Sequence, residues 1–167
     1  MAQAYIIDAV RTPRGIGKVG KGKLAHLHPH HLASTVLRAI RDRNNLETAD
    51  VDDIIWSTNA QRGKQANDLG RMAALDAGYD IKASGVTLDR FCAGGITAVS
   101  LAAAQIMSAM EDVVIAGGTE MMSLTGAMAQ EDAARGVAQQ LADGLHRGIR
   151  RTQARGRLLV RIRLFSL

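Results

Sequence analysis

The sequence predicts an α/β fold with helices packed on the faces of a sheet. Short apolar runs typical of strands alternate along the chain with longer segments whose apolar residues recur at helical spacing. The run Val113–Ala116 is short and wholly apolar, as expected for a strand in a buried sheet position. Strand–helix–strand connections of this kind are right-handed, which places the helices on the sheet faces.

The first expected strand is Ala4–Val10, and a glycine- and lysine-rich segment follows it. Gly15, Gly17 and Gly20 match the G-x-G-x-x-G pattern of nucleotide-binding loops. That pattern needs a helix directly after the glycines, and Pro29 lies where such a helix would run. We therefore interpret the segment as a loop without a nucleotide site.

A cluster of histidines comes next. Clustered imidazoles can bind zinc, but this spacing fits no closed structural site and no cysteine lies nearby. We interpret the cluster as a solvated loop that enters a helix, and we expect no metal ion. The four residues are His26, His28, His30 and His31.

Helices and strands then alternate towards the middle of the chain. Apolar residues at helical spacing predict an amphipathic helix from about Leu32 that ends at Asn44 and Asn45. Residues 51–57 are predicted as a strand and residues 68–77 as a helix.

The later elements surround the only cysteine. Residues 85–88 predict a strand, and apolar residues from Ile96 to Met110 predict a helix. The strand at residues 113–116 is expected to break at Gly117 and Gly118. A last helix is expected over residues 126–144.

Cys92 lies between a predicted strand and the start of a predicted helix. Unpaired N–H groups and the helix dipole favour negative charge at a helix N-terminus, and the thiolate is the nucleophilic form of cysteine. Cys92 is therefore a candidate nucleophile. The alternative is a buried structural thiol, because free cysteines often pack as small hydrophobic residues. Position and chemistry alone leave both interpretations open.

Two motifs resemble the N-terminal half of the thiolase (acetyl-CoA acyltransferase) family. The first is Asp89–Val99 (DRFCAGGITAV), and the second is Glu111–Ser123 (EDVVIAGGTEMMS). Two motifs in the order of the family make a specific match. Many family members carry Ser or Thr where this chain has Gly94.

The resemblance implies a fold and a chemistry. It implies the N-terminal half of a thiolase-like α/β fold: a mixed sheet with helices on both faces and a buried helix that carries the nucleophile. It implies that Cys92 accepts an acyl group from coenzyme A as a thioester, in 3-ketoacyl-CoA thiolysis or acyl-CoA condensation. It further implies acyl-CoA substrates, no permanently bound cofactor, homo-oligomers of the full-length family, and a role in fatty acid metabolism. A cytoplasmic location is expected separately, because Ala4–Val10 is too short for a secretory signal and is interrupted by a charge.

In thiolases, a histidine that activates the nucleophile and a second cysteine lie in the C-terminal half. This chain has one cysteine, and its five histidines lie outside any matching motif. We therefore expect the isolated chain to be catalytically incomplete, and we assign no residue to coenzyme A binding. We also expect an open apolar face on the chain, and with it marginal stability or self-association.

The extent of the family resemblance, together with the charge distribution, predicts three segments. Residues 1–126 are expected to form a partial thiolase N-terminal domain, residues 127–145 a helical extension, and residues 146–167 an arginine-rich tail that is disordered or non-native. Residues 144–167 hold seven arginines and no acid, whereas residues 1–143 hold 14 basic and 16 acidic residues. One cysteine excludes an internal disulfide, and no apolar run reaches membrane-spanning length.

Two other functions stay open from the residues. One is a non-catalytic, thiolase-derived domain that binds a partner. The other, which no base-reading motif supports, is nucleic-acid association through the basic tail. We expect no specific nucleic-acid partner and no membrane partner.

Overall fold

The computed structural model describes residues 3–134. The chain divides after Ala127 into two units, and the sheet and the site described below belong to the first. The predicted tail, residues 146–167, lies outside the described residues, as does the end of the helical extension. No helix in the described part is both long and apolar enough to span a membrane.

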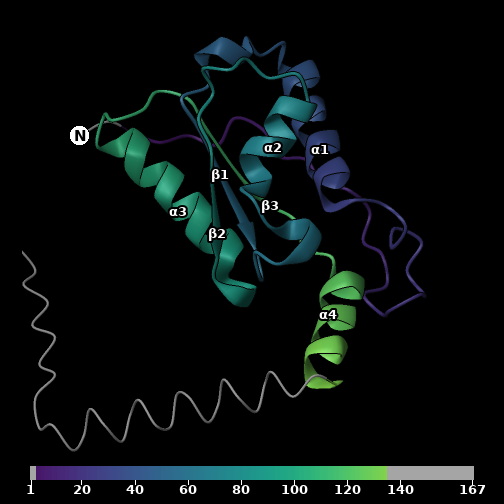
Figure 1. The fold of residues 1–167 in the computed structure, drawn as a ribbon. Coiled ribbons are helices and arrows are strands. Elements are labelled where there is room, and N and C mark those ends of the chain that lie inside the picture. Colours follow the sequence, from purple (N-terminus) through teal and green to yellow (C-terminus); the bar gives the residue numbers. More distant parts are fainter. Residues whose placement is uncertain (1–2, 135–167) are drawn as a thin grey trace, which may run out of the picture. The chain divides into compact units, whose positions relative to one another are not determined.

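A three-stranded parallel sheet forms the centre of the first unit (Figure 1). Its middle strand is β1 (Asp53–Thr58), flanked by β2 (Val86–Asp89) and β3 (Val114–Gly118). Ile55 pairs with Val86 on one side and with Ala116 on the other. The resemblance implied a mixed sheet, and the three described strands are all parallel. Their carboxyl ends therefore meet at one edge of the sheet.

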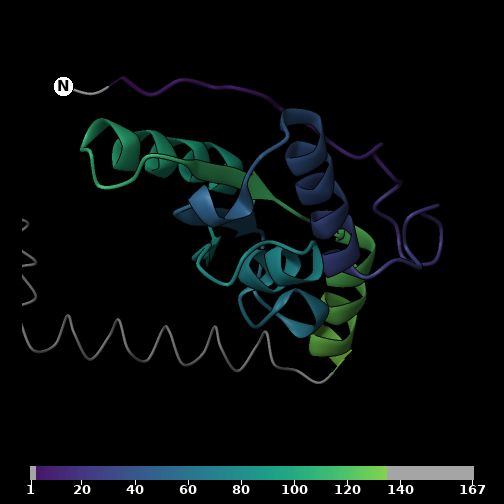
Figure 2. The ribbon, with the colours of Figure 1, turned by 90° about the horizontal axis from the view of Figure 1, so that it is seen from above.

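Helices cover both faces of this sheet (Figures 1 and 2). The helices α1 (Pro29–Asn44) and α2 (Leu69–Asp76) lie on one face, and α3 (Gly94–Met107) lies on the other. The α/β expectation and all three helix positions are confirmed, with ends that shift by a few residues.

Alternation along β1 divides the core into two clusters. Ile54 and Trp56 face α1 and α2 and are almost fully buried with Leu37 of α1. Ile55 points to the opposite face and packs against α3. A strand with apolar residues facing both ways is buried on both sides, so β1 forms the centre of the fold.

The histidine cluster forms the start of α1. His28 is the N-cap residue, and its Nδ1 accepts a hydrogen bond from the backbone N–H of His30 at 3.3 Å. Pro29 occupies the first turn, where a missing N–H costs nothing. The helix therefore begins about three residues before Leu32. Among the described residues, no group of side chains is arranged to hold a metal ion.

The expected strand at Ala4–Val10 is not formed. The segment has no regular structure, and Tyr5, Ile6 and Ile7 are exposed. A strand needs a neighbour to pair its N–H and C=O groups, and no described strand pairs with this segment. The apolar residues of the segment alone do not supply that neighbour.

The break expected at Gly117 and Gly118 is also wrong, because β3 continues through both glycines. A Cβ on Gly117 would lie 2.4 Å from Cζ3 of Trp56. Gly117 is thus required by the close approach of an indole ring and does not mark a turn. The next helix, α4 (Met122–Ala134), begins four residues earlier than predicted.

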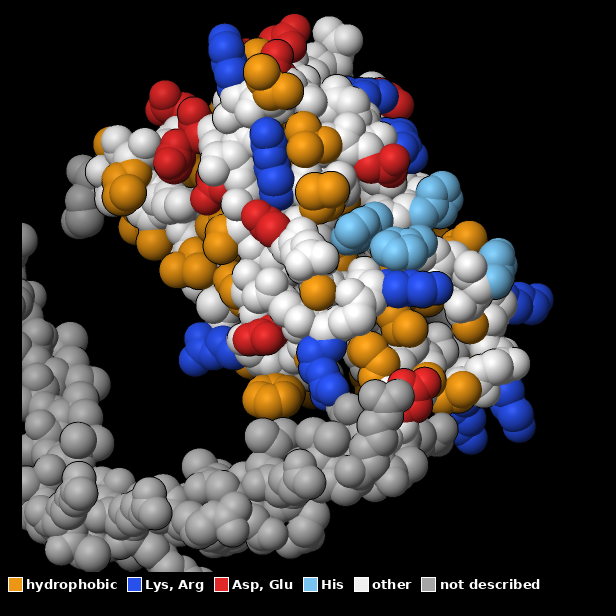
Figure 3. Space-filling model, in the orientation of Figure 1, with side chains coloured by type: hydrophobic (Ala, Val, Ile, Leu, Met, Phe, Trp, Pro, Cys, Tyr) orange, Lys and Arg blue, Asp and Glu red, His pale blue; other side chains and the backbone are white. Residues whose placement is uncertain are grey.

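The helix α3 is not buried as the resemblance implied. Gly94, Ala98 and Ala102 face the sheet and are buried, but Ile96 is 75% exposed and Val99 is 48% exposed. Orange apolar side chains follow this helix on the left side of Figure 3. Only one row of small residues is packed on the sheet, so an apolar face remains open in the described chain.

Candidate active site

Cys92 lies in a short 3₁₀ turn, Phe91–Ala93, between β2 and α3. This position confirms the predicted junction between strand and helix. The thiol is exposed, so the alternative of a buried structural cysteine does not hold. Phe91 adopts the left-handed conformation, with a φ of 45°. This backbone conformation is unfavourable for residues other than glycine, and residues that adopt it are often found at functional sites.

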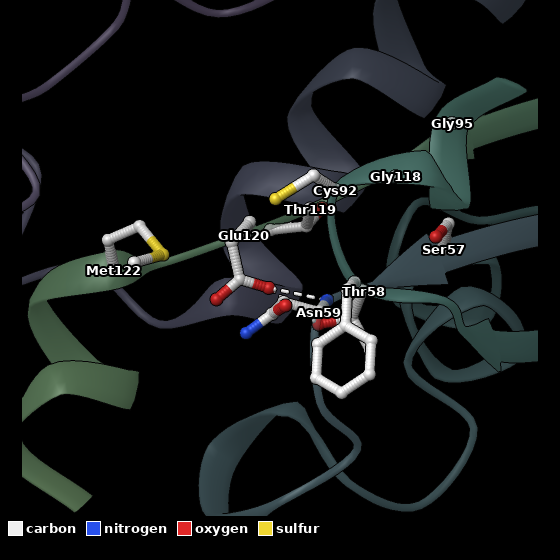
Figure 4. Close-up of a pocket in the computed structure, with 10 residues that line it drawn as sticks. Ser57, Thr58, Asn59, Cys92, Gly95, Gly118, Thr119, Glu120 and Met122 are labelled. Carbon is white, nitrogen blue, oxygen red and sulfur yellow. Dashed lines mark hydrogen bonds between the residues drawn. The ribbon is translucent and has the colours of Figure 1, made fainter. Parts of the chain in front are cut away.

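A pocket of about 380 Å³ opens beside Cys92 at the carboxyl edge of the sheet (Figure 4). In α/β sheets, ligands bind outside the carboxyl ends of parallel strands. The lining residues come from the ends of β1 and β3 and the segments after all three strands. They are Ser57, Thr58, Asn59, Phe91, Cys92, Gly95, Gly118, Thr119, Glu120 and Met122.

Two glycines after Cys92 have different environments. A Cβ on Gly94 would lie 1.7 Å from Oγ of Ser57, so Gly94 allows α3 to begin directly against the end of β1. Gly95 has no described atom within 4 Å of such a position and lines the pocket. The first glycine therefore permits packing, and the second leaves space in the pocket beside the thiol.

The wall formed by the β3 end is tied to β1. The backbone N–H of Thr119 donates to the carbonyl oxygen of Ser57 at 2.9 Å, which extends the ladder beyond the strands. The Oγ1 of Thr119 accepts a buried hydrogen bond from the indole N–H of Trp56 at 3.1 Å. Because the second bond is buried, its loss would leave an unpaired indole N–H.

The side chains of Glu120 and Gln65 form further hydrogen bonds between the segments that follow β1 and β3. The Oε2 of Glu120 accepts a hydrogen bond from the backbone N–H of Asn59 at 2.6 Å, drawn dashed in Figure 4. The same oxygen accepts from Oγ1 of Thr58 at 3.0 Å and from Nε2 of Gln65 at 3.3 Å. Neither Glu120 nor Gln65 was predicted from the sequence as a site residue. The signal in the sequence that could have indicated Glu120 is an acidic residue two positions after a short apolar strand.

The histidines do not take part in this pocket, since all four of the cluster lie at or before the first turn of α1 and none lines it. Burial and the neighbouring His28 lower the pKa of the His30 imidazole, and Asp76 opposes them. Among the described lining residues, Cys92 is the one nucleophilic thiol and Glu120 the one carboxylate.

Comparison with known proteins relates this chain to thiolases. The family model "Thiolase, N-terminal domain" matches residues 4–150. A steroid 3-ketoacyl-CoA thiolase of Mycobacterium tuberculosis is 43% identical over 123 residues, which cover 74% of this chain and 30% of that protein. A beta-ketoadipyl-CoA thiolase of Pseudomonas knackmussii is 38% identical over 143 residues, covering 84% of this chain and 35% of that protein.

A solved structure agrees with these sequences. The crystal structure of the Bacillus anthracis acetyl-CoA acetyltransferase superposes with a TM-score of 0.64 at 38% identity, over 71% of this chain and 29% of that one. The chain thus spans about a third of the length of the relatives it matches. The family model covers most of the chain, and the fold neighbour has the same architecture, so the resemblance of the two motifs is confirmed: the chain belongs to the thiolase family, by way of its N-terminal domain.

Proposed function

We propose that this chain provides the acyl-accepting part of a thiolase active site, with Cys92 as the nucleophile. The observation that carries the proposal is the exposed thiol of the only cysteine, in a pocket at the start of α3. Membership of the thiolase family supports the assignment, because thiolases form their acyl-enzyme on the cysteine of this motif.

The proposed step is a thioester exchange. The Cys92 sulfur, as thiolate, attacks the carbonyl carbon of an acyl-CoA, and a new carbon–sulfur bond forms. The bond from that carbon to the coenzyme A sulfur then breaks, and coenzyme A leaves as a thiolate that takes up a proton. Covalent capture divides acyl transfer into two easier reactions. The positive end of the α3 dipole favours the negative charge that develops beside the pocket.

Acetyl-CoA tests this directly. We expect incubation with acetyl-CoA to add one acetyl group, which mass spectrometry maps to Cys92 and which hydroxylamine removes as expected for a thioester. Cys92→Ser is the matched control, because the hydroxyl keeps the size of the side chain but is a weak nucleophile. An unlabelled Cys92 in a chain whose circular dichroism shows the fold intact would refute the assignment.

The described pocket contains no histidine and no second thiol that could move protons. We therefore propose that the isolated 167-residue chain is acylated without sustained turnover, and steady thiolysis of a 3-ketoacyl-CoA by purified chain would contradict this. We also propose, from the family resemblance, acyl-CoA substrates, no permanent cofactor and homo-oligomeric assembly. A cytoplasmic location is a separate part of the proposal. The full reaction, thiolysis or condensation, belongs to the same proposal.

A second candidate is a non-catalytic domain that binds a thiolase subunit. The exposed apolar face of α3, with Ile96 and Val99, favours it. Co-purification with a thiolase subunit, combined with an unreactive Cys92, would support this function over the first.

A further inference from the structure

We propose that Glu120 and Gln65 are positioning residues that hold in place the pocket wall formed by Thr58 and Asn59 at the end of β1 and by Thr119 and Glu120 after β3. This rests on the proposed function, because the wall matters only if Cys92 accepts an acyl group. Neither residue is assigned a chemical step. Their side chains form hydrogen bonds that join the segment after β1 to the segment after β3.

The Glu120 carboxylate is the first connection. Its Oε2 binds the backbone N–H of Asn59, the first residue after β1, at 2.6 Å, and the hydroxyl of Thr58, the last residue of that strand, at 3.0 Å. The Oε2 of Glu120, a residue that follows β3, therefore holds the backbone in place at the point where the chain leaves β1. Both partners line the pocket.

Gln65 provides a second connection between the segments after β1 and β3, and it does not itself line the pocket. Its side chain is fully buried, with 0% exposure, which is rare for glutamine. The Oε1 accepts from the backbone N–H of Met121 at 2.8 Å, and the Nε2 donates to Oγ1 of Thr58 at 2.7 Å and to the carbonyl oxygen of Ala60 at 3.2 Å. A buried amide with its bonds made is held in one orientation. Gln65 thus supports both segments without lining the pocket.

This arrangement matters for acyl transfer because the substrate carbonyl must meet the Cys92 sulfur within a narrow geometry. A misplacement of about 1 Å can cost roughly a hundredfold in rate. The wall that includes Asn59 limits where the acyl group can lie relative to the thiol. Removing the Glu120 carboxylate releases the Asn59 N–H while the strands stay paired.

The test compares Glu120→Ala with Glu120→Gln. Glutamine keeps an oxygen that can accept from Asn59 and Thr58 but removes the charge, whereas alanine removes both. We expect Glu120→Ala to slow acetylation of Cys92 by acetyl-CoA by roughly tenfold to a hundredfold. We expect Glu120→Gln to retain most of the rate, and alkylation by the small reagent iodoacetamide to stay the same in both variants. Glu111→Gln, at the opposite end of β3, is the control for loss of a carboxylate.

Equal losses in Glu120→Gln and Glu120→Ala would overturn the proposal, because they would assign the effect to charge. An unchanged acetylation rate in Glu120→Ala would overturn it as well. A second readout does not depend on acyl transfer. It is the rate at which N-phenylmaleimide modifies Cys92, the only thiol, divided by the rate at which iodoacetamide modifies it. We expect this ratio to rise in Glu120→Ala, since a loosened wall admits a bulkier reagent. If the native chain resists acetyl-CoA, the proposed function fails, and an unchanged ratio would separately refute the positioning role.

Discussion

Replacing Gly117 with alanine tests how the sheet and its indole ring fit together. Gly117 lies in β3 beside Trp56 of β1, and the two residues are paired in the sheet. A Cβ at position 117 would lie 2.4, 2.8 and 2.9 Å from three atoms of the Trp56 ring. Ordinary contacts begin at 3.4 Å, so the ring or the strand must move by about 1 Å.

The expected cost follows from two terms. Extra volume in a packed core destabilises by about 1–3 kcal/mol. A ring that moves also strains the 3.1 Å bond from Trp56 Nε1 to Thr119 Oγ1, and a lost hydrogen bond of this kind costs about 1 kcal/mol. Together they predict that Gly117→Ala lowers the free energy of unfolding by about 2–4 kcal/mol. Thr119 lines the pocket, so the change should also disturb the site.

Denaturant unfolding followed by tryptophan fluorescence measures this cost, because Trp56 is the only tryptophan. Gly95→Ala is the control. A Cβ added at Gly95 would have no described atom within 4 Å, and this residue lies in α3. Alanine at this position should therefore leave the free energy of unfolding unchanged or raise it by about 0.5–1 kcal/mol. A Gly117→Ala midpoint equal to that of the native chain would refute the argument that the ring requires this glycine.

Two pH predictions follow from buried and hydrogen-bonded groups. Burial lowers the pKa of His30, so the unfolded chain binds more protons below pH 6.5; stability should fall as the pH drops through that value, and His30→Phe should flatten this part of the unfolding profile. Backbone N–H groups of Val113 and Asp112 lower the pKa of Asp52, so its contribution is complete above the usual value of 3.8 and is lost at lower pH. Asp52→Ala should lower stability at neutral pH and reduce its acid dependence, and a profile parallel to that of the native chain would contradict this.

Local pattern was sufficient for the elements around Cys92. The strand before it and the helix after it follow from residues within about twenty positions, because apolar spacing and helix-end chemistry are local properties. The exposure of the thiol did not follow from the local pattern and is a finding of the structure. The family resemblance rested on the same stretch. The start of α1 was misplaced only because the histidine cluster, interpreted as loop, supplies its cap at His28.

Properties that depend on distant residues could not be predicted. Gly117 was interpreted as a strand breaker, since the sequence does not show that Trp56, 61 positions earlier, needs the space. Gln65 lies between the predicted strand at residues 51–57 and the predicted helix at residues 68–77, and its residue type gives no sign of burial. It is fully buried because its amide hydrogen-bonds to Thr58 and Met121. Ala4–Val10 has the residue types of a strand but lacks a described partner. In each case the sequence shows the chemistry of the residue itself but does not show which distant residue packs against it or pairs with it.

The open face of α3 connects the fold to the chemistry of the pocket. The helix is apolar on several sides, and only Gly94, Ala98 and Ala102 are buried against the sheet. Ile96 follows directly after Gly95, which lines the pocket, and is 75% exposed. Any surface that covers Ile96 must therefore come close to the pocket beside the thiol, and it would exclude water there. Because electrostatic effects strengthen when water is excluded, packing on α3 and reactivity of Cys92 are expected to change together.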